Sequence, residues 1–236
     1  MEVGKASFET PDKHFTILDA PGHRGFVPNM IAGAAQADIA VLVISARRGE
    51  FETGFEKAGQ TREHAMLVKT LGTKHLIVLI NKMDDPTVAW SEERYLECKT
   101  KLEPYLCKQL QFNLQRDIYF MPCSGLTGAF LRDIVPDTVC PWYRGPSLFE
   151  YLNDHLPSIQ RNVDGAVRLP VAERFQDMGT IIGGKLESGI ISKNSQLLVM
   201  PNRVTVQVLL LLQPPPPPPP LILLLLRISS LITAVS

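Results

Sequence analysis

Four short apolar runs, separated by longer stretches with helical patterning, constrain the fold of this chain more than any other feature. They span residues 15–18, 39–44, 76–80 and 118–121. The runs are rich in Ile, Leu and Val and do not alternate with polar residues, which is typical of parallel strands covered on both faces. Strands and helices that alternate in this way predict a doubly wound α/β fold with a mostly parallel sheet.

Two of the intervening stretches carry clear helix signals. In "SEERYLECKTKLEPYL", residues 91–106, Ser91 is a good N-cap, and Glu92 and Glu93 favour the positive end of the helix dipole. The stretch "TREHAMLVKTLG" closes at Gly72, a typical helix stop. Ligands of doubly wound sheets bind beyond the carboxyl ends of the strands. The short polar motifs that follow the strands are therefore the candidate functional site.

The first of these motifs is "DAPGH", residues 19–23. A carboxylate at a strand end, here Asp19, can hold a magnesium ion directly or through a water molecule. Gly22 leaves room for its backbone N–H to approach a terminal phosphate. His23 could then orient an attacking water molecule. The alternative interpretation is an ordinary turn punctuated by Pro21 and Gly22.

The second motif is "NKMD", residues 81–84, which follows the apolar run "HLIVLI". Guanine presents two adjacent donors, and one carboxylate can accept both, so Asp84 suits guanine and does not suit adenine. Asn81 can bridge to the base or brace the loop, and the aliphatic stem of Lys82 can cover the ring face. A polar turn with an Asx-type hydrogen bond is the alternative.

The third motif is "CSGL", residues 123–126, after the apolar "IYFMP". Ser124 could donate a hydrogen bond to Asp84, and the backbone N–H groups of Gly125 and Leu126 could face the guanine carbonyl oxygen. The motif on its own is more typical of a turn. Its weight comes from its order and spacing behind the other two.

Composition narrows the remaining classes of function. Lys and Arg together number 24, as do Asp and Glu, so the 236-residue chain has no net charge that would favour a nucleic-acid surface. The four cysteines form no Cys-x-x-Cys pair, which disfavours a zinc site and indicates reduced thiols in the cytosol. The glutamates near residue 50 are expected on a solvated surface, and the pair Arg47-Arg48 is weak evidence for contact with ribosomal RNA.

The motifs D-x-x-G, N-K-x-D and S-G-L, in this order, resemble the GTP-binding domain of translational GTPases of the elongation factor one-alpha-like family. The stretches "HLIVLINKMDDPTV" and "FMPCSGLTGA" are similar to the eukaryotic peptide chain release factor GTP-binding subunits. The resemblance runs from about residue 2 to residue 209. It implies a P-loop-type G domain, GTP or GDP and Mg²⁺ as ligands, GTP hydrolysis in translation termination, and a cytoplasmic location.

The resemblance also implies partners and residue roles. The partners are the ribosome and the stop-codon-reading release factor. Asp19 and Gly22 would belong to switch II and the magnesium shell, His23 would be the catalytic residue, and Asn81, Lys82, Asp84, Ser124, Gly125 and Leu126 would bind guanine. Elongation-type and ribosome-rescue GTPases are the alternative relatives. A non-hydrolysing fragment or interaction protein that keeps the guanine pocket is the alternative function.

The phosphate loop of that family, G-x-x-x-x-G-K-[ST], does not occur in these 236 residues. The sequence "VGKAS" at residues 3–7 contains Gly-Lys but does not match the phosphate-loop motif. No glycine stands five residues before Gly4, and Ala6 replaces the metal-binding hydroxyl. We therefore expect residues 1–160 to form a G domain that lacks the phosphate loop and switch I, with its N-terminal part missing. Nucleotide binding by the chain alone should be very weak.

The sequence pattern changes near residue 161, where the alternation of apolar runs and helical stretches ends. Residues 161–209 contain short β-like runs with glycine turns and predict part of an antiparallel β-barrel. Residues 210–236 form a Leu/Pro-rich tail, expected to be disordered or a translated pyrimidine-rich tract. Pro214–Pro220 could form a polyproline II rod that binds a polyproline-recognising domain. The apolar run at 221–226 is too short to span a membrane.

Overall fold

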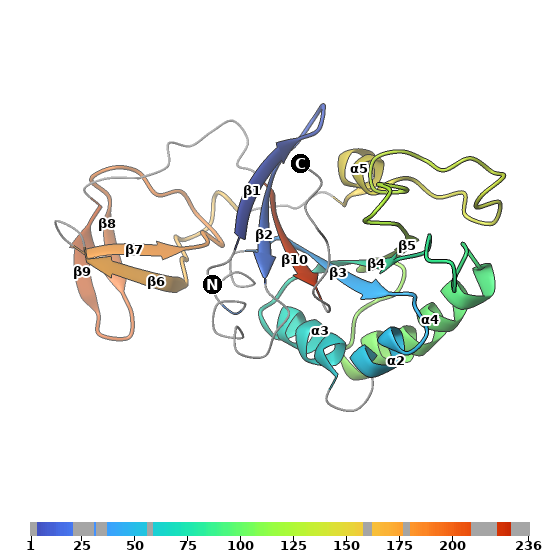
Figure 1. Cartoon of the computed structure of the whole chain (residues 1–236). Coiled ribbons are helices and arrows are strands. Elements are labelled where there is room, and N and C mark those ends of the chain that lie inside the picture. Colours follow the sequence, from blue (N-terminus) through green and yellow to red (C-terminus); the bar gives the residue numbers. More distant parts are fainter. Residues whose placement is uncertain are drawn as a thin grey trace. The chain divides into compact units, whose positions relative to one another are not determined.

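A six-stranded sheet forms the centre of the larger part of the molecule (Figure 1). In spatial order its strands are β1 (Gly4–Glu9), β2 (His14–Ala20), β10 (Leu221–Arg227), β3 (Ile39–Ser45), β4 (His75–Asn81) and β5 (Ile118–Pro122). Strand β1 runs antiparallel to β2, and every other neighbouring pair is parallel. The predicted doubly wound, mostly parallel G-domain sheet is confirmed, and all four predicted runs are strands.

The computed structural model describes residues 4–20, 31, 37–55, 59–157, 162–176, 180–208 and 221–227. The chain divides into two units, Met1–Pro157 with Leu221–Ser236, and Ser158–Pro220. The expected division at residues 160 and 209 stays a prediction.

The helices of the larger unit follow from their end signals. They are α2 (Glu50–Phe55), α3 (Gln60–Thr70), α4 (Glu92–Pro104) with a π-helical turn at Tyr105–Gln109, and α5 (Leu148–Glu150) with a second π-helical turn at Tyr151–His155. Ser91 caps α4, because its hydroxyl accepts a hydrogen bond from the Arg94 backbone N–H at 3.2 Å. Gly72 follows α3 with a φ of 86°, a conformation that favours glycine.

The core lies between the sheet and the helices α2, α3 and α4, which Figure 1 shows on one side of it. Alternate residues of β3, namely Ala40, Leu42 and Ile44, pack in one cluster with Val68 of α3 and Leu102 of α4. The residues between them in β3 are buried as well. A strand buried on both faces explains why the sequence shows apolar runs without alternation.

Strand β10 is the main difference from expectation. The tail from residue 210 is expected to be disordered or a translated pyrimidine-rich tract. Within it, Leu221–Arg227 lies between β2 and β3 and pairs in parallel with both (Figure 1). Six consecutive apolar residues are long enough for a strand. In this position both edges of the strand have backbone hydrogen-bond partners. The sequence of residues 221–227 alone does not predict this placement.

The smaller unit consists of two antiparallel pairs. Strand β6 (Val171–Gln176) pairs with β7 (Thr180–Gly184), and β8 (Gln196–Val199) pairs with β9 (Val204–Gln207). The β-like runs expected there are confirmed as strands, and the proline run 214–220 lies outside the described residues. No helix in the described ranges combines the length and the apolarity that crossing a membrane requires.

Candidate functional site

The loops after β4 and β5 lie side by side at the carboxyl edge of the sheet. Strand β4 pairs with β5 in parallel, with Ile80 opposite Pro122. Just beyond this pair, the Cys123 backbone N–H donates to the Ile80 carbonyl at 2.9 Å. The sheet register therefore brings together the motifs at 81–84 and 123–126, which are some 40 residues apart in the sequence.

Asn81 ties these two loops to each other. Its side chain is buried, with 5% exposure, and its Oδ1 accepts hydrogen bonds from the backbone N–H groups of Lys82 and Gly125, each at 2.7 Å. Of the two roles considered from the sequence, this geometry is that of a brace. One amide oxygen thus sets the spacing between the two candidate base-binding loops.

The Lys82 side chain is held at its charged end. Its Nζ lies 2.7 Å from Oε2 of Glu50 at the start of α2, and the side chain is 24% exposed. The backbone of Lys82 has a φ of 63°, in the left-handed region that few non-glycine residues adopt. The ion pair fixes the head of the side chain and leaves the aliphatic stem as its contact surface.

The Asp84 carboxylate is half-buried, and no described residue donates a hydrogen bond to it or forms an ion pair with it. The expected bond from Ser124 is not observed. Ser124 is fully buried, and its hydroxyl instead accepts a hydrogen bond from the Thr127 backbone N–H at 3.1 Å. Ser124 thus shapes its own turn, and the carboxylate of Asp84 keeps both oxygens available for a ligand.

Gly125 and Leu126 differ in what they can offer. The Gly125 N–H donates its hydrogen bond to Asn81 Oδ1. It is therefore not available to a base, in contrast to expectation. Within the described part of the chain the Leu126 N–H has no acceptor, and Leu126 is 82% exposed. Leu126 is therefore the residue of this pair whose N–H could meet a carbonyl oxygen.

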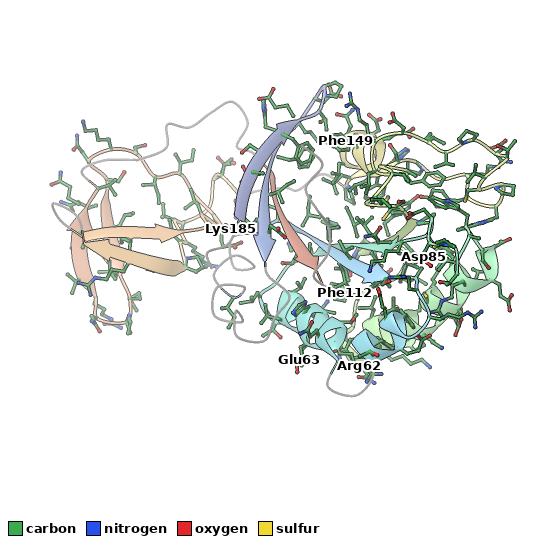
Figure 2. All side chains as sticks on the ribbon, viewed as in Figure 1. Arg62, Glu63, Asp85, Phe112, Phe149 and Lys185 are labelled. Atoms are coloured by element: carbon green, nitrogen blue, oxygen red, sulfur yellow. The ribbon has the colours of Figure 1, made fainter. Side chains whose placement is uncertain are left out.

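Asp85 is a structural residue at the same edge of the sheet and lies outside the three motifs (Figure 2). Its Oδ1 accepts hydrogen bonds from the Thr87 N–H at 2.9 Å and the Thr87 hydroxyl at 2.6 Å, and Arg47 Nε lies 2.7 Å from its Oδ2. The bonds from Thr87, together with Arg47, lower the pKa of the Asp85 carboxyl. The sequence Asp-Pro-Thr is a recognisable Asx-turn signal.

Glu50 and Glu52 are not a free solvated surface, in contrast to expectation, and Glu56 of the same acidic stretch lies outside the described residues. Glu52 pairs with Arg94 at 2.9 Å and also accepts a hydrogen bond from the Gly49 N–H at 2.6 Å. Arg94 is only 4% exposed on its side chain, and its Nε donates to the Ala46 carbonyl at 2.7 Å. Burial would raise the pKa of the Glu52 carboxyl, but the bonds from Arg94 and Gly49 lower it overall.

This ion-pair network fixes the segment between β3 and α2 against α4. Arg94 also pairs with Glu97, and hydrogen bonds from Lys101 and Arg94 lower the pKa of the Glu97 carboxyl to about 2. Arg47, considered as an RNA contact, is occupied by Glu50 and Asp85. Sequence alone does not reveal these partners, because Arg94 and Glu52 lie 42 residues apart.

Asp19 lies near the end of β2, opposite Gly4 of β1 and Leu225 of β10. It is half-buried and reaches the carboxyl edge of the sheet that also carries Asn81. Gly22 and His23 lie outside the described residues. Across the described ranges, no three His, Cys, Asp or Glu side chains gather as a ready-made metal site.

The family model for the elongation factor Tu GTP binding domain matches residues 1–158. The chain belongs to this family. That assignment agrees with the order of the three motifs along the parallel sheet, and the resemblance to translational GTPases is confirmed.

Several curated relatives carry the same description, eukaryotic peptide chain release factor GTP-binding subunit. The chain is 55% identical to the one from Schizosaccharomyces pombe over 208 residues, which are 88% of this chain and 31% of that protein. It is 56% identical to the one from Debaryomyces hansenii over 209 residues, or 89% of this chain and 29% of the relative. The chain thus spans about 30% of the length of these relatives.

Two solved structures are similar to this chain in fold. The structure of sup35 complexed with GDP matches with a TM-score of 0.58 and 51% identity, covering 86% of this chain and 47% of that one. The Ski7 GTPase-like domain from S. cerevisiae matches with a TM-score of 0.61 at 22% identity, covering 83% of this chain and 45% of that one. The second likeness concerns the fold alone.

Proposed function

We propose that the chain binds guanine nucleotides at the carboxyl edge of its sheet, with Asp84 reading the base. The observation that carries the proposal is the half-buried Asp84 carboxylate, which no described residue engages, in a loop that Asn81 ties to the 124–126 turn. Guanine offers a ring N–H and an adjacent amine, and one carboxylate can accept from both. Adenine offers an acceptor at the ring position and would be rejected.

Lys82 and Leu126 complete the base site in this proposal. The Lys82 stem, held by the ion pair between its Nζ and Glu50, lies along one face of the base. The Leu126 N–H donates to the guanine carbonyl oxygen. Asn81, Ser124 and Gly125 hold the two loops at their spacing, through the bonds from Lys82, Gly125 and Thr127.

For the phosphates we propose Asp19, Gly22 and His23. Mg²⁺ is usually bound through one or two carboxylates together with substrate phosphates, so the half-buried carboxylate of Asp19 fits such an ion. Bound there, Mg²⁺ would neutralise phosphate charge. Gly22 would approach the terminal phosphate through its N–H, and His23 would orient the attacking water molecule, as the family resemblance implies.

We further propose that the whole protein hydrolyses GTP during translation termination in the cytoplasm. The release-factor relatives are about three times as long as the 236-residue chain. The partners of the whole protein would be the ribosome and the stop-codon-reading release factor. The release-factor relatives, at 53–56% identity, support this assignment over the elongation-type alternative. Binding of a polyproline-recognising domain to Pro214–Pro220 stays a prediction.

A second candidate is guanine binding without hydrolysis by these 236 residues alone. It is favoured by the lack of a G-x-x-x-x-G-K-[ST] motif in their sequence. That loop supplies several backbone N–H groups and a lysine to the phosphates. Charge-assisted hydrogen bonds contribute about 1.5–3 kcal/mol each, so three of them correspond to about three to six powers of ten in affinity.

The test of base reading is Asp84→Asn. A carboxamide can accept only one of guanine's donors and offers its own N–H to the other position, which suits xanthine. We expect the preference for GDP over XDP to fall by about 10- to 100-fold, the value of one charge-assisted bond pair. Competition binding of the two nucleotides measures this ratio.

The matched control is Asp117→Asn. Asp117 is a buried carboxylate that directly precedes β5, at the opposite edge of the sheet, where it pairs with Arg116. This variant should lose some stability and keep the ratio of GDP to XDP affinity. An unchanged ratio in Asp84→Asn itself would show that Asp84 does not read the base.

A further inference from the structure

We infer that Trp142 is a positioning residue for Asp84: its indole N–H holds the loop that presents the carboxylate. The inference rests on the proposed guanine binding and names a residue outside the three motifs. The Trp142 Nε1 donates a hydrogen bond to the carbonyl of Trp90 at 2.7 Å. Trp90 is the last residue before Ser91, the N-cap of α4, so this bond anchors the far end of the loop that begins at Lys82.

A second hydrogen bond carries this anchor to the residue beside Asp84. The Trp90 N–H donates to the Met83 carbonyl at 2.8 Å, which closes the loop between residues 83 and 90. The Met83 N–H in turn donates to the Cys123 carbonyl at 3.2 Å, and the Met83 side chain is fully buried. Asp84 is therefore attached to a residue that is fixed through both of its backbone polar groups.

The loop needs this support because its backbone is strained. Ala89 and Trp90 are consecutive non-glycine residues with φ values of 46° and 54°, in the left-handed region. Such a conformation costs free energy and persists only where surrounding contacts hold it. The bond from Trp142 acts directly on one of these two residues, so we expect its loss to release the loop.

Trp142 is itself held in place by aromatic contacts. Its ring lies 4.9 Å from the ring of Tyr95 in α4, measured between centroids, and 6.1 Å from that of Tyr143. The Trp90 ring packs edge-on against Phe130 at 5.6 Å between centroids, and Phe130 is fully buried. The indole N–H therefore has a fixed direction, toward the Trp90 carbonyl.

The function of this brace follows from the geometry of base reading. A carboxylate discriminates guanine only if it meets two donors at once, and a displacement of about 1 Å weakens such a paired contact. Generic loss of stability would not change which base is preferred. Base preference is therefore the readout that separates positioning from mere structural support.

The test compares Trp142→Phe with Tyr105→Phe in the full 236-residue chain. Trp142→Phe keeps an aromatic ring beside Tyr95 and removes the N–H donor. Tyr105→Phe removes a similar side-chain-to-backbone bond, from the Tyr105 hydroxyl to the Arg62 carbonyl at 2.8 Å, away from the site. Two properties are measured: hydrogen exchange of the amides in residues 82–91 without nucleotide, and the ratio of GDP to XDP affinity.

We expect Trp142→Phe to speed exchange in residues 82–91 and to lower the GDP preference by about 5-fold, the value of one neutral hydrogen bond. Tyr105→Phe should change neither. Unchanged exchange in Trp142→Phe, or faster exchange with an unchanged base preference, would overturn the inference. Equal affinities for GDP and XDP in the unsubstituted chain would contradict the proposed function and the link to Asp84, while the exchange result still decides whether Trp142 holds the loop.

Discussion

His64 shows how one buried side chain links this fold to pH. It lies in α3 with only 3% of its surface exposed, and its Nδ1 has no hydrogen-bond partner among the residues that the structure describes. Burial lowers the pKa of its imidazole to about 4, from an ordinary value of 6.5. Between these values the unfolded chain binds a proton that the folded chain excludes, so folding stability should fall as the pH falls.

From pH 7.5 to pH 5 this residue should remove about 2 kcal/mol from the free energy of unfolding. Thermal melts of the chain and of His64→Leu at both pH values measure the effect, and the variant should lose less stability on acidification. His155→Leu, which replaces an exposed histidine, should behave like the unsubstituted chain. Equal acid sensitivity of the His64→Leu variant and the chain would rule out His64 as its source.

Residue identities at the site could be predicted, but their partners could not. The motif N-K-x-D identifies Asn81 and Asp84 as candidates from the sequence alone. The bond from Gly125 to Asn81 joins residues 44 apart, and it depends on the pairing of β4 with β5. For the same reason the sequence suggests a hydrogen bond from Ser124 to Asp84, whereas the Ser124 hydroxyl accepts a hydrogen bond from the Thr127 N–H in its own turn. Local sequence suggests which groups are polar and does not select among distant partners.

Among the elements, the position of β10 gives the most specific prediction about the sheet. Leu224, at its centre, lies opposite Leu18 of β2 and Ala40 of β3. A proline there removes a backbone N–H and leaves a buried carbonyl unpaired, which costs about 1–3 kcal/mol. We expect Leu224→Pro to lower the melting temperature and to speed amide exchange in residues 15–18 and 39–43.

Leu198→Pro is the control for this variant, because it places a proline in β8 of the smaller unit. It should leave exchange in residues 15–18 and 39–43 unchanged. If Leu224→Pro also leaves those amides unchanged, the strand between β2 and β3 is not formed by the tail.

The same strand marks the limit of prediction at the level of elements. The runs at 39–44 and 76–80 could be assigned because their composition and their alternation with helices suffice. The run at 221–226 has an equally apolar composition, but it directly follows a proline run, Pro214–Pro220. Its place depends on the space between β2 and β3, which is a property of the tertiary structure.

At the scale of the whole molecule, the base-reading and phosphate-binding halves of the proposed site differ in completeness. Asn81, Lys82, Asp84 and the 124–126 turn are assembled around one edge of the sheet. For the phosphates the sequence offers Asp19, Gly22 and His23 without a G-x-x-x-x-G-K-[ST] loop. The chain should therefore recognise the base and hold the phosphates poorly.

Calorimetric titration of the 236-residue chain with GTP, GDP, guanosine and ATP measures how much of the affinity comes from the base and how much from the phosphates. We expect binding weaker than micromolar for GTP and GDP, only a small gain of GTP over guanosine, and weaker binding of ATP than of GTP. These results would mean that the base supplies most of the recognition. Sub-micromolar affinity for GTP would require a phosphate site beyond Asp19, Gly22 and His23, and equal affinities for GTP and ATP would contradict base reading by Asp84.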